Sequence, residues 1–123
     1  MFEYQINTPQ TKAAKMLIFL HGYNDCVSNY RQIFDLFCQN IPLAYVIMPQ
    51  SPEICDKNPQ QRQWFGMLQY DSQNLRTKPQ TPTKQIFEIY QKAAGDINKC
   101  AAELNDFIDT LQKKYNITDS QTY

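Results

Sequence analysis

The chain has 123 residues and a formal net charge of zero, from 12 Lys and Arg against 12 Asp and Glu. This length fits one small domain and excludes two complete ones. The balanced charge, with no long basic run, argues against nucleic acid as a partner. The longest apolar run, residues 41–48, is far shorter than the roughly 20 residues of a spanning helix, so we expect no membrane span.

The amino-terminal residues and the cysteines indicate a compartment. Residues 1–10 lack the basic and then apolar pattern of a secretory signal, so we expect a cytoplasmic location. The four cysteines stand at positions 26, 38, 55 and 100, without the close pairs that zinc sites use. We expect free thiols rather than a disulfide framework, and neither a metal nor a cofactor.

The first half of the chain reads as strand, strand, helix, strand. Residues 2–6 alternate apolar and polar side chains, which is typical of a short edge strand. Residues 16–20 and 44–48 are apolar on both faces, as in parallel strands that helices cover. Between them, apolar residues from Tyr30 to Ile41 recur at helical spacing, with Ser28 or Asn29 placed to cap the first turn. This order predicts a βαβ unit.

The second half combines an aperiodic stretch with one long helix. Residues 49–84 show no clean period, but the apolar side chains around Trp64 favour packing over disorder. A helix of about 30 residues is expected to follow, weakened locally by Gly95. Its expected buried face comprises Ile86, Tyr90, Ala93, Ile97, Ala101, Leu104, Ile108, Leu111 and Tyr115. Residues 116–122 are turn-like and Tyr123 could open a strand, so the last crossover looks like an unfinished unit.

One strand end has the character of an active site. The apolar run 16–20 leads into His21-Gly22-Tyr23-Asn24-Asp25, where the carboxyl end of a parallel strand would place a ligand. We expect Gly22 to permit a tight turn that aims the following backbone N–H groups into the crevice, where they could stabilise an oxyanion. The alternative is an ordinary strand-to-helix turn with a hydrogen-bonded histidine.

The order of several motifs adds a family resemblance. LIFLHGYND, an amphipathic helix, YVIMPQSPE, a loop with QWFGM and a long helix follow one another. This series resembles the amino-terminal half of the phospholipase/carboxylesterase family of α/β hydrolases, which includes the acyl-protein thioesterases. The resemblance covers nearly the whole chain. It implies a partial α/β-hydrolase fold, with a mostly parallel sheet and helices on its faces, in a single incomplete domain over residues 1–123.

The resemblance also implies roles for the residues of the turn. The backbone N–H of Tyr23 would be one oxyanion donor, with Gly22 and Asn24 shaping the loop. Asn24 stands where the family usually has a second glycine, and asparagine tolerates left-handed backbone angles well enough to keep the turn. His21 would be structural and not the catalytic base, and Asp25 would be a hydrogen-bonding brace rather than an acid.

Trp64 and Phe65 would line the acyl pocket of such a hydrolase. The substrate class implied is a carboxylic ester or thioester. For Trp64, an equally weighted alternative is that a lone tryptophan simply pins its loop to the core.

The residues that would perform the reaction are missing. The family's serine lies on a Gly-x-Ser-x-Gly elbow, but no two of Gly22, Gly66 and Gly95 are four positions apart. No catalytic residue can therefore be assigned, and the chain resembles a hydrolase truncated before its elbow strand and inactive alone. Two alternatives stay open: half of a split hydrolase completed by a second chain, or a non-catalytic binding module.

Overall fold

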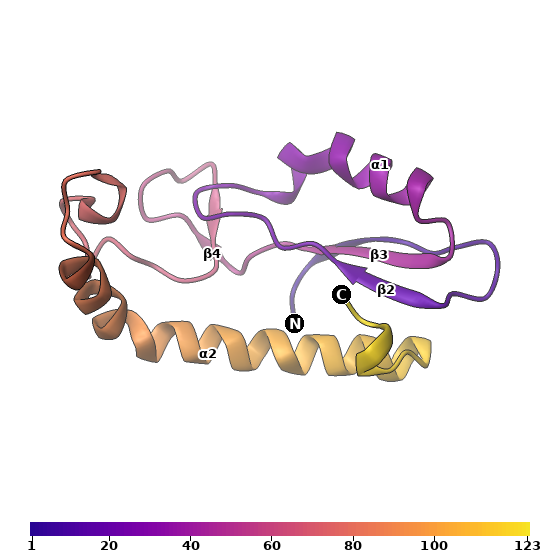
Figure 1. Cartoon of the computed structure of the whole chain (residues 1–123). Coiled ribbons are helices and arrows are strands. Elements are labelled where there is room, and N and C mark those ends of the chain that lie inside the picture. The colour runs from indigo at the N-terminus through magenta and orange to yellow at the C-terminus, as the bar shows by residue number, and fades with distance from the viewer.

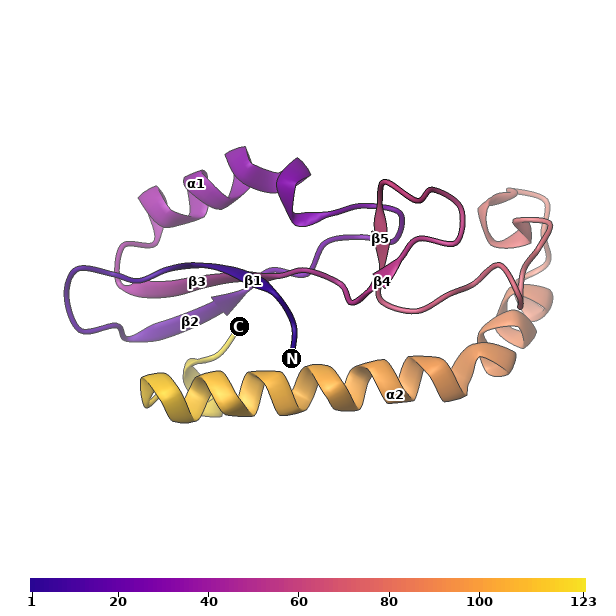
Figure 2. The ribbon, with the colours of Figure 1, turned by 180° about the vertical axis from the view of Figure 1, so that it is seen from behind.

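A computed structural model describes residues 1–123 as three layers (Figure 1). A small sheet lies between helix α1 on one side and the long helix α2 on the other, and both termini lie between the sheet and α2 (Figures 1 and 2). The helices are α1 (Arg31–Asn40) and α2 (Thr83–Tyr115), with 3-10 turns η1 (Val27–Tyr30), η2 (Leu75–Thr77) and η3 (Asp119–Gln121). The strands are β1 (Tyr4–Asn7), β2 (Lys15–Ile18), β3 (Ala44–Pro49), β4 (Glu53–Ile54) and β5 (Arg62–Gln63).

The main sheet has the order β1-β3-β2, so the two strands of the βαβ unit are neighbours. β2 pairs parallel to β3 with Met16 opposite Tyr45, which confirms the predicted unit. β1 is an edge strand, as expected, but it runs antiparallel to β3 with Tyr4 opposite Pro49. The sheet is therefore mixed, because β2 and β3 are parallel and β1 is antiparallel.

The last two residues lie beside the free edge of β2. Tyr123 donates its backbone N–H to the Met16 carbonyl at 2.9 Å, and the Ile18 N–H donates to the Tyr123 carbonyl at 2.8 Å. Met16 and Thr122 form a parallel bridge. The expectation that Tyr123 could open a strand is confirmed, and this pairing extends the parallel part of the sheet past β2.

Helix α2 spans 33 residues and runs along most of the length of the molecule (Figure 1). Its predicted length is confirmed, and so is most of its predicted face: Ala93 and Leu111 are buried, and five further members are half-buried. Ile89 and Phe107 are buried, whereas Tyr90 is 42% exposed. The main core between α2 and the sheet comprises Phe2, Met16, Ile47, Phe107, Leu111 and Ile117.

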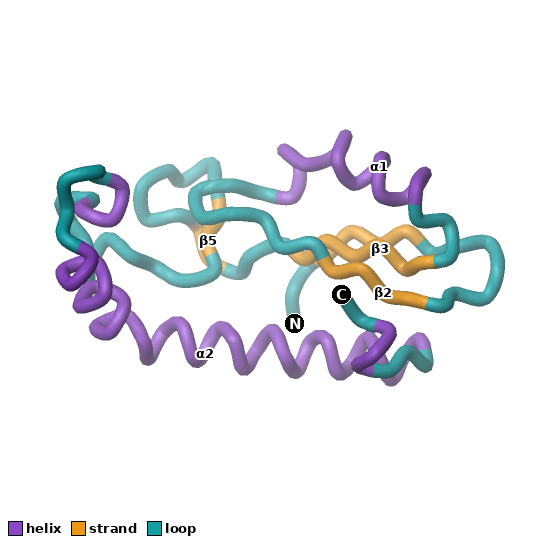
Figure 3. Tube along the Cα trace, viewed as in Figure 1, coloured by secondary structure: helices purple, strands orange, loops and turns teal.

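The aperiodic stretch is ordered against α2. It forms the short antiparallel ladder of β4 and β5, which the sequence pattern did not indicate. A second core cluster joins Met67 to Ile89 and Ala93 of α2, which confirms the expectation of packing. Figure 3 shows how much of this end of the molecule is loop rather than regular structure.

Helix α1 does not begin as predicted. Ser28 and Asn29 lie inside the 3-10 turn η1, and neither side chain caps α1, whose N-cap is Tyr30. The 3-10 turn supplies the local hydrogen bonds that a capping side chain would otherwise provide. No residue of α1 is fully buried, so its outer face contributes little to the core. All four cysteines are free thiols, and none of the helices is apolar over a length that could cross a membrane.

Candidate active site

The turn after β2 presents an unpaired backbone donor. The N–H of Tyr23 donates to no acceptor in the chain. Asn24 adopts the left-handed conformation with φ of 57°, as expected for asparagine at this position. Gly22 has no positive φ, and a Cβ there would meet nothing within 4 Å. Asn24 therefore supplies the left-handed backbone angle of the turn, and Gly22 does not.

His21 is buried and bonded entirely to backbone. Its Nε2 accepts a hydrogen bond from the Ser51 N–H at 3.1 Å, which places the ring proton on Nδ1. Nδ1 lies 2.9 Å from the carbonyl oxygen of Gly22. Both ring nitrogens are thus engaged with the backbone, which supports a structural role for His21.

Asp25 acts as an acceptor within the same turn. Its carboxylate accepts hydrogen bonds from the Cys26 N–H at 2.9 Å, from Asn29 and from the Tyr30 hydroxyl. Burial alone would raise the pKa of Asp25, but the hydrogen bonds from Tyr30, Asn29 and Cys26 outweigh it and lower the pKa below its ordinary value. A carboxylate held ionised in this way fits the predicted brace.

Trp64 lies directly against the turn. Its indole N–H donates to the His21 carbonyl at 2.7 Å, and its ring lies 5.2 Å from the imidazole. It also meets Phe2 edge to face at 5.8 Å. The neighbouring Phe65 packs instead on the second core cluster. Trp64 therefore pins the loop to the turn, and both residues line a small cavity of about 160 Å³ against α2.

A second contact between turn and loop involves Asp56, which sequence reasoning missed. The Tyr23 hydroxyl donates to Oδ1 of Asp56, while Oδ2 accepts the Met67 and Leu68 N–H groups at 2.9 and 2.8 Å. Burial, and then the hydrogen bond to Asp56, raise the pKa of the Tyr23 phenol far above its ordinary value, so it stays a donor. No sequence signal could have found this contact, because the partners are 33 positions apart and Asp56 lies in an aperiodic loop.

Two cations lie near the ring of Tyr23. Lys57 Nζ is 5.8 Å and the Arg76 guanidinium 5.7 Å from its centroid. Arg76 is itself held by the carboxylate of Asp71, whose side chain is fully buried, at 2.9 Å. Such contacts between cations and aromatic rings are favourable, so the side chain of Tyr23 is constrained as well as bonded.

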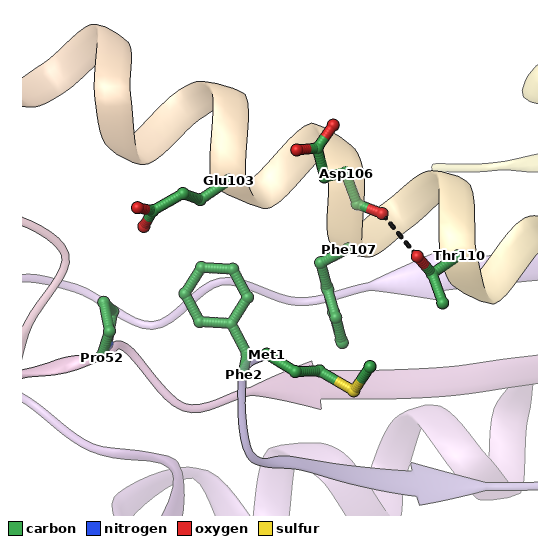
Figure 4. A pocket seen from close by; sticks show the side chains of 7 residues that line it. All are labelled: Met1, Phe2, Pro52, Glu103, Asp106, Phe107 and Thr110. Atoms are coloured by element: carbon green, nitrogen blue, oxygen red, sulfur yellow. Dashed lines mark hydrogen bonds between the residues drawn. The ribbon is translucent and has the colours of Figure 1, made fainter.

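None of the serines forms a catalytic pair with the single histidine. Ser51 comes nearest, but it meets His21 through its backbone N–H, while its buried hydroxyl has no partner. A larger groove of about 400 Å³ lies between the amino terminus and α2 and shares Pro52 and Glu103 with the cavity beside Trp64 (Figure 4). Figure 4 shows Phe2 and Phe107 in it with Glu103 and Asp106 on the helix above. It contains none of the predicted site residues.

Comparison with known proteins agrees with the fold and the order of the motifs. Among solved structures, the crystal structure of esterase PE8 is similar over 98% of this chain, with a TM-score of 0.73 and 14% sequence identity. The chain spans 49% of that esterase, and at this identity the likeness concerns the fold alone. No curated protein sequence matches. The model of the phospholipase/carboxylesterase family matches residues 2–123, and the chain therefore belongs to that family.

Proposed function

We propose that this chain forms the oxyanion and acyl-pocket half of an active site that hydrolyses carboxylic esters or thioesters. The serine, acid and base would come from residues outside these 123, in a second chain or a further segment. The observation that carries the proposal is the unpaired Tyr23 N–H in a braced turn at the carboxyl end of β2. Family membership supplies the reaction class.

In the proposed reaction, the external serine attacks the acyl carbon with its proton passing to a histidine. The carbonyl oxygen becomes an oxyanion, which accepts a hydrogen bond from the Tyr23 N–H and a second from the backbone after the serine. The acyl chain would lie against Trp64 and Phe65. His21 stays out of the proton transfer because both of its ring nitrogens are engaged with the backbone.

A complementation assay tests the proposal. Residues 1–123 are co-expressed with the carboxyl-terminal half of a family member, beginning at the strand before its Gly-x-Ser-x-Gly elbow, or joined to it if the halves do not associate. We expect hydrolysis of p-nitrophenyl butyrate by the complex and by neither half alone. A folded complex whose serine reacts with a fluorophosphonate but which turns over no ester would overturn the proposal.

Two variants of Asn24 sharpen the assay. Asn24 adopts the left-handed conformation. Glycine adopts it freely, whereas it costs an alanine about 1 kcal/mol, so Asn24→Ala populates the turn less than Asn24→Gly does. We expect kcat to fall about fivefold in the alanine variant and to hold in the glycine variant. Equal rates in the two variants would show that the shape of the turn does not matter to the reaction.

The edge of β2 beyond the pairing with Tyr123 could take a further strand, either from a second chain or from a further segment. Leu20 has an unpaired backbone N–H just beyond the residues that pair with Tyr123. An extended segment carrying the elbow could add there as a parallel strand.

A further inference from the structure

Two contacts connect the turn to the loop that carries the predicted pocket wall, and one of them depends on a residue, Asp56, that the sequence did not single out. Trp64 makes the first contact, to the His21 carbonyl. Asp56 makes the second, because its two carboxylate oxygens face different segments. One oxygen accepts from the Tyr23 hydroxyl and the other from the backbone of Met67 and Leu68, just past Phe65.

We propose that Asp56 is a positioning residue that sets the orientation of the Tyr23 backbone N–H relative to the Trp64-Phe65 loop. This inference rests on the proposed oxyanion role of Tyr23, and it adds a residue that neither the motifs nor the strand-end argument includes. Asp56 touches no reacting atom in this scheme. It acts through the Tyr23 side chain on the backbone of the same residue.

The surroundings of Asp56 make it a fixed anchor. Its own N–H donates to the Gln63 side chain at 2.9 Å, and Gln63, which is buried, also donates to Glu53 at 3.0 Å. The backbone of Asp56 is thus attached to the β4 and β5 ladder. The loop passes close to it at Gly66, where a Cβ would lie 3.4 Å from Oδ2 of Asp56.

The other contacts of Tyr23 hold its ring without directing its hydroxyl. Lys57 and Arg76 lie about equally far from the ring centroid and donate no hydrogen bond to Tyr23. A contact between a cation and a ring constrains distance more than rotation, whereas a hydrogen bond requires a defined direction. The hydrogen bond to Asp56 therefore fixes the rotation of the Tyr23 side chain. Through that side chain it fixes the backbone of the turn.

The test monitors the backbone of the turn through the amide resonances of ¹⁵N-labelled protein. The complemented complex is used if the chain alone self-associates. Tyr23→Phe removes only the hydroxyl, and Asp56→Asn removes the carboxylate. We expect both to displace the amide resonances of residues 23 and 24, with little further change in the double variant. Tyr70→Phe is the matched control, because its hydroxyl donates at 2.6 Å to Asp96 of α2 and not to Asp56.

The result that would overturn the proposal is specific. If Asp56→Asn shifts the amides of Met67 and Leu68 but moves residues 23 and 24 no more than Tyr70→Phe does, Asp56 holds the loop alone. Titration with butylphosphonate, a tetrahedral anion, distinguishes failure of the positioning role of Asp56 from failure of the oxyanion role of Tyr23. If it leaves the Tyr23 amide of the wild-type complex unmoved although Asp56→Asn displaces it, the oxyanion role fails and the positioning role stands. In the active complex we expect Asp56→Asn to lower kcat more than it changes KM.

Discussion

The indole N–H of Trp64 donates to the backbone carbonyl of His21 at 2.7 Å, although the two residues are 43 positions apart. The contact is partly buried, and the two rings lie tilted against each other at 5.2 Å. It explains why a long segment without helical or strand periodicity is ordered. A tryptophan anchored by its N–H holds the loop in place and still presents its ring to the cavity beside α2.

We expect Trp64→Phe to lower the free energy of unfolding by about 1 kcal/mol, because a ring remains but the hydrogen bond to His21 is lost. Urea unfolding monitored by circular dichroism measures the change. Leu68→Ala, at an exposed position of the same loop, is the control and should change stability by less than about 0.5 kcal/mol. Equal stability of Trp64→Phe and wild type would show that the hydrogen bond contributes nothing.

Two glycines should respond oppositely to alanine. Gly95 lies within α2 with open space around its Cβ position, so Gly95→Ala should raise the free energy of unfolding by about 0.5–1 kcal/mol. At Gly66 a Cβ would lie 3.2 Å from the Gln63 side-chain nitrogen. Gln63 cannot easily move because both ends of its amide are hydrogen-bonded.

Gly66→Ala should therefore lower the melting temperature while Gly95→Ala raises it, as measured by thermal unfolding. Gly22→Ala serves as the neutral comparison, since its Cβ would meet nothing and its φ is not positive. A stabilising Gly66→Ala would mean that the Gln63 side chain can move without cost to its hydrogen bonds.

The elements with a regular period were predictable and the contacts between them were not. The βαβ unit, the edge strand and the length of α2 follow from periodicity, because each depends on local spacing. Most of the predicted face of α2 is buried or half-buried, but apolar side chains also lie beside it, and only packing against Met67 of the distant loop selects Ile89 over Tyr90. The β4 and β5 ladder is two residues per strand and too short to leave a pattern.

The candidate site divides in the same way. The turn after β2 could be located from the sequence because a strand end and a Gly-containing motif mark it. Asparagine was expected to tolerate the left-handed conformation at position 24, and Asn24 adopts it, whereas Gly22 has no positive φ. The bond from Tyr23 to Asp56 depends on the path of an aperiodic loop, which no local rule predicts.

Acid should destabilise the chain through Asp71. Burial opposes ionisation of this carboxyl, but hydrogen bonds from the Leu75 N–H and from Arg76 outweigh it and lower its pKa in the folded state. A depressed folded pKa gives stability that is present above the unfolded value, near 3.9, and is lost as pH falls through the folded pKa.

We therefore expect the free energy of unfolding to decline as pH falls below about 4. Asp71→Asn should lose about 2 kcal/mol at pH 7 and show a smaller decline in acid. Urea unfolding between pH 7 and pH 3 measures both. Glu88→Gln, an exposed carboxyl on α2, is the control that should leave the decline unchanged. An identical pH slope in Asp71→Asn would assign the acid sensitivity to other carboxylates.

The 123-residue chain alone should not hydrolyse acyl esters or thioesters above the buffer rate. It has no Gly-x-Ser-x-Gly elbow, and its single histidine is bonded to backbone on both nitrogens. Loss of nucleophile and base removes most of the roughly 10⁶-fold acceleration of such sites. Labelling by a fluorophosphonate, or turnover that Ser51→Ala or Ser120→Ala abolishes, would contradict this expectation.

The free edge of β2 should make the isolated chain associate with itself. Beyond the pairing with Tyr123, the Leu20 N–H has no acceptor and its side chain is 44% exposed. Leu17, Ile41 and Tyr123 line an adjoining apolar groove. An unpaired apolar strand edge recruits further strands, and a lysine on such an edge opposes this. Light scattering at tens of micromolar should therefore detect oligomers that Leu20→Lys reduces, whereas Leu68→Lys, which adds the same charge to an exposed loop, should not. A monomeric wild type would show that this edge is protected. Equal effects of the two lysines would locate the association elsewhere.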